Sequence, residues 1–206
     1  MQEEDIYAEI SSIRNLMERS SKFISLSGLS GILAGIYALI GAAVGYIMIY
    51  REHSGLRLRD HYVNDPLVYW PLFLVALGVL VLSLATGVWL SARNAHKKGQ
   101  SFWNPGSKRL IASVSVPLIS GGLFILILIF RGEYGIIAPA SLLFYGLALV
   151  AGSNYTFSDV KWLGLLEIAL GLIASLFPGY GLIFWSIGFG VLHILYGSIM
   201  HFKYDR

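Results

Sequence analysis

The sequence contains six apolar stretches, each about as long as a bilayer core is thick. They cover residues 27–50, 69–91, 110–130, 136–151, 162–177 and 182–200. A hydrocarbon core of roughly 30 Å takes about 20 helical residues to cross. Backbone groups inside lipid must be hydrogen-bonded within the protein, and these stretches show no alternation of apolar and polar residues, so helices are favoured over a β-barrel. We predict an all-α fold, a polytopic membrane bundle of six transmembrane helices.

The composition fits a membrane protein and excludes several soluble classes. Hydrophobic residues make up 56% of the chain and charged residues 13%, whereas soluble domains carry about 25% charged residues. The absence of cysteine excludes disulfides, thiolate metal sites and a cysteine nucleophile. No P-loop, Rossmann fingerprint, H-E-x-x-H or G-x-S-x-G motif is present. We therefore expect a protein that is not an enzyme, with no cofactor, no metal and no nucleic-acid partner.

Lysine and arginine predict how the chain is oriented, because they resist translocation across the membrane. If the N-terminus is inside, eleven of them fall on inner segments and four on outer segments. The inner set is Arg14, Arg19, Lys22, Arg93, Lys97, Lys98, Lys108, Arg109, Lys161, Lys203 and Arg206, and the outer set is Arg51, Arg57, Arg59 and Arg131. We predict an integral protein of the cell (inner) membrane with both termini in the cytoplasm.

Residues 1–24 form a separate predicted unit, a cytoplasmic amphipathic helix that precedes the transmembrane domain of residues 25–206. Apolar side chains recur there at helical spacing: Ile6, Ile10, Ile13, Met17 and Ile24. Such a stripe suits a helix lying against the inner membrane surface or against the bundle. It also fits the a and d positions of a short coiled coil that docks a protein partner or a second copy. The spacing leaves both interpretations open.

The longest predicted outer loop, residues 51–66, carries mixed charge. It contains two histidines and three acidic residues, Glu52, His53, Asp60, His61 and Asp65. The histidines lie eight residues apart, which is not the i, i+4 spacing of a helical zinc motif. Proline at position 66 and the polar composition argue against a helix in this loop. We interpret it as a solvated loop and assign no metal site.

The first apolar stretch carries two G-x-x-x-G pairs, Gly31 with Gly35 and Gly41 with Gly45. Small residues at this spacing let two helices approach closely in lipid, where no hydrophobic force drives helices together. We predict a helix-packing seam along these four glycines. The partner helix is either within the same chain or, as the less favoured alternative, in a second protomer of a homodimer.

Glu167 and His193 are the only ionisable acidic or basic residues inside the six stretches, away from their ends. Such residues are costly in lipid and seldom face it. Counted from Gly179, in the turn between the last two stretches, Glu167 is twelve residues back and His193 fourteen forward. At about 1.5 Å per residue their depths differ by only about 3 Å. The two are candidates for handling protons or ions, and the alternative is a purely structural pair.

The segment from residue 162 to residue 197 resembles one hairpin repeat of the HdeD-like acid-resistance membrane proteins. The features that carry the resemblance are Gly171-Leu172-Ile173-Ala174, Phe177-Pro178-Gly179 and Leu195-Tyr196-Gly197. The resemblance implies a small, stress-associated, six-span membrane protein and transfers no catalytic or binding residue. The chain as a whole also resembles other small six-span bacterial membrane proteins.

Two functions follow from these observations. The favoured one is a non-enzymatic accessory, sensor or stress-related membrane protein that acts through partners bound by residues 2–24 or by the first span. The alternative is a small transporter, or a protein that translocates protons or cations, with Glu167 and His193 at its centre. An enzyme acting on lipid ranks last, because it needs several polar groups converging at one membrane surface and only the histidine and aspartate residues of the outer loop offer any.

Overall fold

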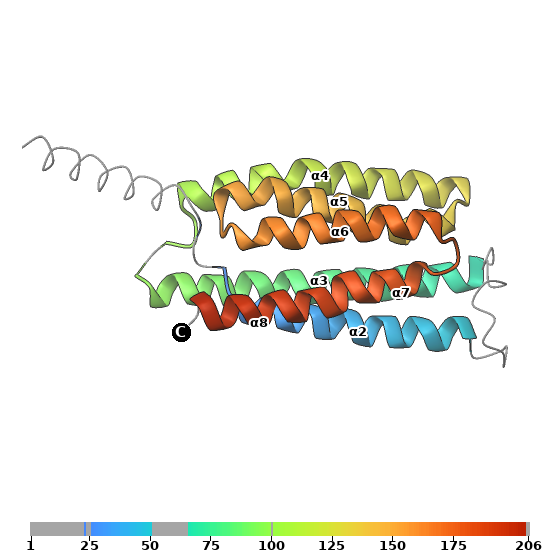
Figure 1. The fold of residues 1–206 in the computed structure, drawn as a ribbon, viewed down its shortest axis with the longest axis horizontal. Coiled ribbons are helices and arrows are strands. Elements are labelled where there is room, and N and C mark those ends of the chain that lie inside the picture. Colours follow the sequence, from blue (N-terminus) through green and yellow to red (C-terminus); the bar gives the residue numbers. More distant parts are fainter. Residues whose placement is uncertain (1–22, 24–25, 51–65, 100, 205–206) are drawn as a thin grey trace, which may run out of the picture.

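The computed structural model describes residue 23 and residues 26–50, 66–99 and 101–204, and these are helical with no strand. The helices are α2 (Gly28–Tyr50), α3 (Pro66–Lys97), α4 (Pro105–Arg131), α5 (Ile137–Gly152), α6 (Asp159–Leu176), α7 (Gly181–Trp185) and α8 (His193–Tyr204), with the 3-10 turns η1 (Tyr134–Ile136) and η2 (Ser153–Tyr155) and the π-helix η3 (Ser186–Leu192). α7, η3 and α8 follow one another without a break and form one rod (Figure 1). The predicted all-α class is confirmed.

Five of these helical segments are long and apolar enough to cross a membrane. They are α2, α3, α4, the segment from η1 to η2, and the α7–α8 rod. α6 is a helix of 18 residues, but Asp159, Lys161 and Glu167 reduce its apolar character. The structure therefore confirms a helical bundle with several helices long and apolar enough to span a membrane, and α6 as a sixth span stays a prediction. The predicted amphipathic helix of residues 1–24 and the predicted outer loop fall, apart from Phe23 and Pro66, outside the described residues.

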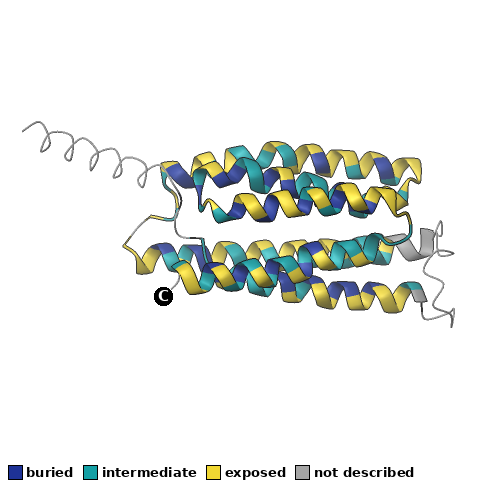
Figure 2. Cartoon of the chain, in the orientation of Figure 1, coloured by how far each residue is buried: buried dark blue, intermediate teal, exposed yellow. Residues whose placement is uncertain are grey.

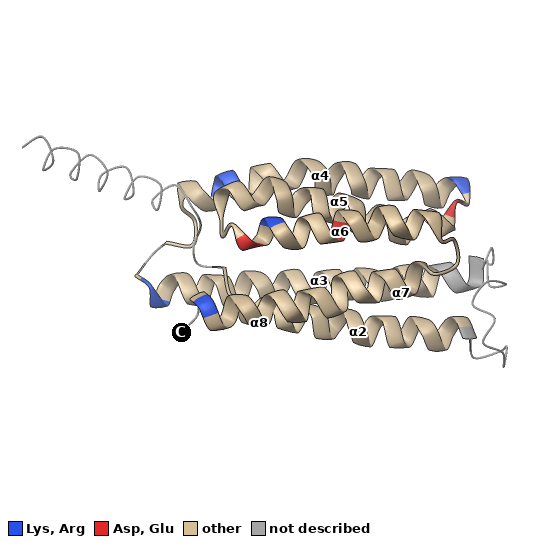
Figure 3. Cartoon of the chain, viewed as in Figure 1, with Lys and Arg blue, Asp and Glu red and all other residues tan. Residues whose placement is uncertain are grey.

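The outer surface of the bundle is apolar, as expected for helices in contact with lipid. Exposed residues occur along its whole length (Figure 2), and many of them are large and apolar, among them Val116, Phe130 and Leu176, which are 69%, 95% and 76% exposed. Soluble monomers rarely expose contiguous apolar patches of this extent. The charged residues that the structure describes lie mainly at the two ends of the bundle (Figure 3), whereas Glu167 lies in the middle of α6.

The helices pack in two layers, and the contacts within each layer are more extensive than the contacts between the layers. α4, α5 and α6 form one layer, and α2, α3 and the α7–α8 rod form the other (Figure 1). Within the layers the closest packing joins α5 to α6, α4 to α5, α2 to α8 and α2 to α3. Between the layers, the rod meets α5 and α6, whereas α3 and α4 are hardly in contact. The seam between rod, α5 and α6 is therefore what joins the two layers.

Helix α4 begins earlier in the chain than hydropathy predicts. The apolar stretch predicts a start near residue 110, but the helix begins at Pro105. The side chain of Asn104 accepts a hydrogen bond from the Ser107 backbone N–H, and the Ser107 hydroxyl accepts one from the Asn104 N–H. This reciprocal capping, with proline in the first turn, stabilises a helix start in polar surroundings.

The four glycines of the predicted seam all contact helices of the same chain. Gly31 and Gly35 lie against the α7–α8 rod, and Gly41 and Gly45 against side chains of α3. The approach is tight, since a Cβ atom added at Gly35 would lie 2.6 Å from the carbonyl oxygen of Gly190. The structure thus places the seam at contacts inside the chain.

Replacing Gly35 with alanine should therefore destabilise the bundle. The added methyl group meets backbone atoms that cannot yield, and overpacking of this kind costs about 1–3 kcal/mol. The matched control is Gly78→Ala on α3, where a Cβ would have no atom within 4 Å and alanine favours a helix. Thermal unfolding in detergent, followed by tryptophan fluorescence, should show a lower midpoint for Gly35→Ala only. Equal midpoints would contradict the close contact.

Candidate functional site

Glu167 lies in the middle of α6 and is fully buried, with 0% of its surface exposed. Neither of its carboxylate oxygens has a hydrogen-bond partner. A Cβ atom at Gly188 of η3 would overlap with Oε2 of Glu167, so the absence of a side chain there provides the space for the carboxylate. An ionised carboxylate without partners is very costly in a dry, apolar place. Its charge state therefore depends on the nearest ionisable group.

That group is His193, the first residue of α8, which is 6% exposed. Its Nδ1 atom lies 3.5 Å from Oε1 of Glu167 and 3.0 Å from the carbonyl oxygen of Gly188. A carbonyl oxygen can only accept, so Nδ1 carries a proton and donates it to Gly188. The structure thus brings together the two ionisable residues that the sequence singles out.

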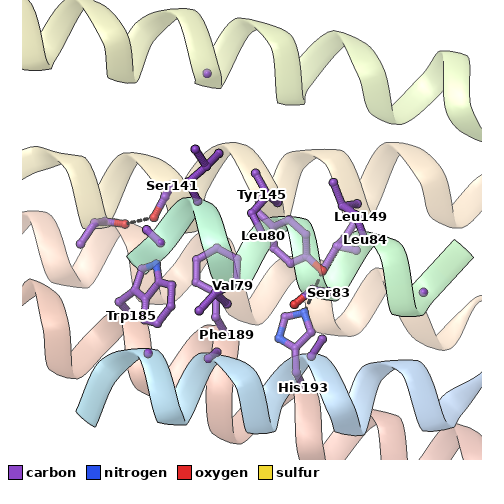
Figure 4. Close-up of a pocket in the computed structure, with 18 of the residues that line it drawn as sticks. Val79, Leu80, Ser83, Leu84, Ser141, Tyr145, Leu149, Trp185, Phe189 and His193 are labelled. Carbon is purple, nitrogen blue, oxygen red and sulfur yellow. Dashed lines mark hydrogen bonds between the residues drawn. The ribbon is translucent and has the colours of Figure 1, made fainter. Parts of the chain in front are cut away.

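Tyr145 of α5 completes the cluster, and sequence reasoning missed it. Its hydroxyl group lies 2.7 Å from Nε2 of His193, and this bond is drawn in Figure 4. With Nδ1 protonated and the imidazole neutral, Nε2 accepts and the tyrosine hydroxyl donates. The Tyr145 ring also packs against Phe189 of η3, with ring centroids 5.0 Å apart. We name Tyr145, Glu167 and His193 the polar cluster.

The π-helix η3 precedes His193 directly in the chain and positions the groups around it. Its residues Gly188 and Gly190 are buried: Gly188 adjoins Glu167, and Gly190 packs against Leu39 of α2. π-helical turns are rare and occur often at functional sites. Here η3 supplies the Gly188 carbonyl that accepts from His193 and the Phe189 ring that flanks both His193 and Tyr145.

One side of the polar cluster faces a cavity of about 1510 Å³ between the two layers. Tyr145, His193, Phe189 and Trp185 form part of its wall, together with Ser83 of α3 (Figure 4). Glu167 does not line the cavity and lies behind His193. A chain of polar atoms thus runs from the cavity wall, through the tyrosine hydroxyl and the imidazole, to a carboxylate that is closed off from solvent.

The other predicted residues lie elsewhere. The four α2 glycines belong to helix packing, although Gly31, Gly41 and Gly45 also border the cavity. The histidines and acidic residues of the predicted outer loop lie outside the described residues. Within the part of the chain that the structure describes, no three histidine or acidic side chains are grouped so that they could hold a metal ion.

Comparison with protein-family models, with curated proteins and with solved structures finds no match for this chain.

The fit of Glu167 against η3 can be tested with a double-mutant cycle. Gly188→Ala should lower the free energy of unfolding by about 1–3 kcal/mol, because the new methyl group overlaps with the carboxylate of Glu167 and with Cδ2 of Leu142. Glu167→Ala removes the carboxylate and leaves the Leu142 contact, so Gly188→Ala should cost less in the Glu167→Ala background. Residues in direct contact typically show coupling of about 0.5–3 kcal/mol. Strict additivity, measured by thermal or denaturant unfolding in detergent, would contradict the contact.

Proposed function

We propose that this chain is a proton-responsive, non-enzymatic integral membrane protein, a sensor or accessory protein in which the polar cluster controls how the two helix layers pack. The observation that carries the proposal is the position of the cluster. Its members come from α5, α6 and α8, so it lies on the seam that joins the layers. An ionisable pair held dry at such a place is a functional candidate by default in membrane proteins.

Protonation would act through the net charge of the seam. Glu167 and His193 together carry no net charge when they share one proton, either as two neutral groups or as an ion pair. A second proton leaves a net positive charge in an apolar seam, where an unpaired charge is strongly disfavoured. Among the described residues, His193 is the titratable group that contacts Glu167, and Tyr145 is hydrogen-bonded to His193. Added charge therefore favours a looser arrangement of the rod against α5 and α6.

The orientation that we propose has α6 as a sixth span and both chain termini in the cytoplasm, in the cell (inner) membrane. The ends of α3 and α8 and the starts of α4 and α6 lie at the same end of the bundle (Figure 3). That end carries every described lysine and arginine except Arg131, namely Arg93, Lys97, Lys98, Lys108, Arg109, Lys161 and Lys203. Positive charge is typical of cytoplasmic ends. Residues 2–24, which precede α2 in the chain, are the proposed docking segment for a partner.

Distances between the layers should depend on pH through Glu167. The chain has no cysteine, so spin labels can be placed at two introduced ones. Ile47→Cys on α2 and Leu176→Cys on α6 lie in different layers and are 56% and 76% exposed. In liposomes the distance distribution should shift between about pH 8 and pH 5 in the labelled protein and stay fixed with Glu167→Gln. Pulsed electron spin resonance measures the distance distribution in the labelled protein and in its Glu167→Gln variant.

Asp159→Asn is the matched control for this experiment. Asp159 accepts hydrogen bonds from Lys203, at 2.8 Å, and from Tyr204, at 2.7 Å. These bonds, with the lysine charge, lower the pKa of Asp159 below its ordinary value. Its contribution to stability is thus present above an ordinary carboxyl pKa and is lost only as the pH falls through the lowered pKa. The control should keep the full shift between pH 8 and pH 5. A shift that persists in Glu167→Gln would refute the proposal.

Proton or cation translocation is the second candidate, favoured by the polar chain from cavity to carboxylate. It requires solvent to reach Glu167 in some state of the protein. In proteoliposomes, a cysteine at position 167 should then react with a membrane-impermeant thiol reagent. A proton flux, read with an enclosed pH-sensitive dye, should be lost with Glu167→Gln and kept with Asp159→Asn. If the cysteine does not react and no proton flux is measured, translocation is contradicted and the sensor proposal is retained.

A further inference from the structure

The cavity between the layers runs along the whole bundle. Its wall on α2 extends from Gly28 to Ile49, a helical length of about 32 Å at 1.5 Å per residue. This matches the roughly 30 Å thickness of a hydrocarbon core. The volume of about 1510 Å³ also exceeds the ~300–1,000 Å³ of small-molecule sites. The space is thus as deep as the membrane and larger than a drug-sized ligand needs.

The cavity opens sideways between α3 and α4. These two helices are hardly in contact, and side chains of both that line the cavity are also open to the surroundings. Leu80 and Leu84 of α3 are 52% and 57% exposed, and Ile119 and Leu123 of α4 are 61% and 58% exposed. In a bilayer this opening faces the hydrocarbon core. The side chains at this opening are apolar, so acyl chains can enter it from the side.

The cytoplasmic end of the cavity, in the proposed orientation, is polar and flanked by positive charge. Ser91 of α3 and Ser107 of α4 line that end. Arg93 follows Ser91 by two residues, and Lys108 and Arg109 follow Ser107 directly. Basic side chains near a membrane surface attract anionic lipid with about 1 kcal/mol each. At the opposite end the described residues offer one cation, Arg131.

We propose that this cavity is a binding site for an anionic phospholipid, with its acyl chains between α3 and α4 and its headgroup at Arg93, Lys108 and Arg109. The membrane-deep apolar wall takes the chains, the gap between α3 and α4 admits them, and the basic end selects the headgroup. This site is distinct from the polar cluster and extends beyond the proposed proton response, although Tyr145 and His193 form part of its wall.

Two glycines allow the cavity to be filled without disturbing the fold. Gly87 of α3 and Gly122 of α4 line it, and a Cβ at either would have no atom within 4 Å. Gly78 of α3 has the same open surroundings but does not line the cavity. Gly87→Phe with Gly122→Phe is therefore the test variant, and Gly78→Phe is the matched control for an added phenyl group on the same helix.

The measurement is native mass spectrometry of protein taken from vesicles made of equal parts phosphatidylcholine and phosphatidylglycerol. The wild-type protein and Gly78→Phe should retain phosphatidylglycerol in preference to phosphatidylcholine, and Gly87→Phe with Gly122→Phe should retain at least fivefold less. Lys108→Gln with Arg109→Gln should abolish the preference, and Arg131→Gln should keep it. Glu167→Gln should leave retention unchanged, so that failure of the proton response and failure of the lipid site can be told apart.

Four results would overturn the lipid site. They are wild-type protein without bound lipid, equal retention when the cavity is filled, equal retention of the two lipids, and a dimer without lipid that the phenylalanine pair dissociates. The last result would assign the space between α3 and α4 to a second copy of the chain.

Discussion

The arrangement of the bundle depends on keeping one carboxylate out of water. Glu167 has no hydrogen-bond partner in the described structure and no exposed surface, so its charge can be balanced only by His193. That requirement fixes α8 against α6, and the bond from Tyr145 to His193 fixes α5 against α8. Gly188 matters for the same reason, because any side chain there would occupy the space of the carboxylate. This pair of ionisable groups therefore lies at the main contact between the two layers.

The two layers differ from this seam in the forces that hold them. Inside the layers, glycines bring backbones into contact: Gly35 meets Gly190, and Gly146 meets Gly164 between α5 and α6. Such contacts do not respond to pH. Between the layers, the rod is the main bridge, and α3 and α4 leave their side of the bundle open. A change of charge at the cluster therefore acts where the structure is least constrained, and rigid layers would convert it into a movement of one layer against the other.

The helices could be predicted from the sequence, but the site could be predicted only in part. Apolar length predicted each helix, because lipid imposes its thickness on any span, and the turn at Gly179 placed Glu167 and His193 at one depth. Tyr145 could not be found in this way, since a tyrosine in an apolar stretch is ordinary and its helix is distant in sequence from His193. The π-helix could not be predicted either, because its contacts include α2 and α6, which lie outside the local sequence. The local sequence signal was the pair of glycines Gly188 and Gly190.

The cavity and the cluster share a wall, and this makes their occupants interdependent. The Tyr145 hydroxyl group lies on the cavity side of the cluster and is hydrogen-bonded to His193. An acyl chain against that wall keeps water away, which disfavours added charge on the cluster. By thermodynamic linkage the effect is reciprocal: a cluster that gains charge draws water to the wall and weakens binding of the chain by the same factor. A protein with both properties would report acidity as a change in the lipid that it holds.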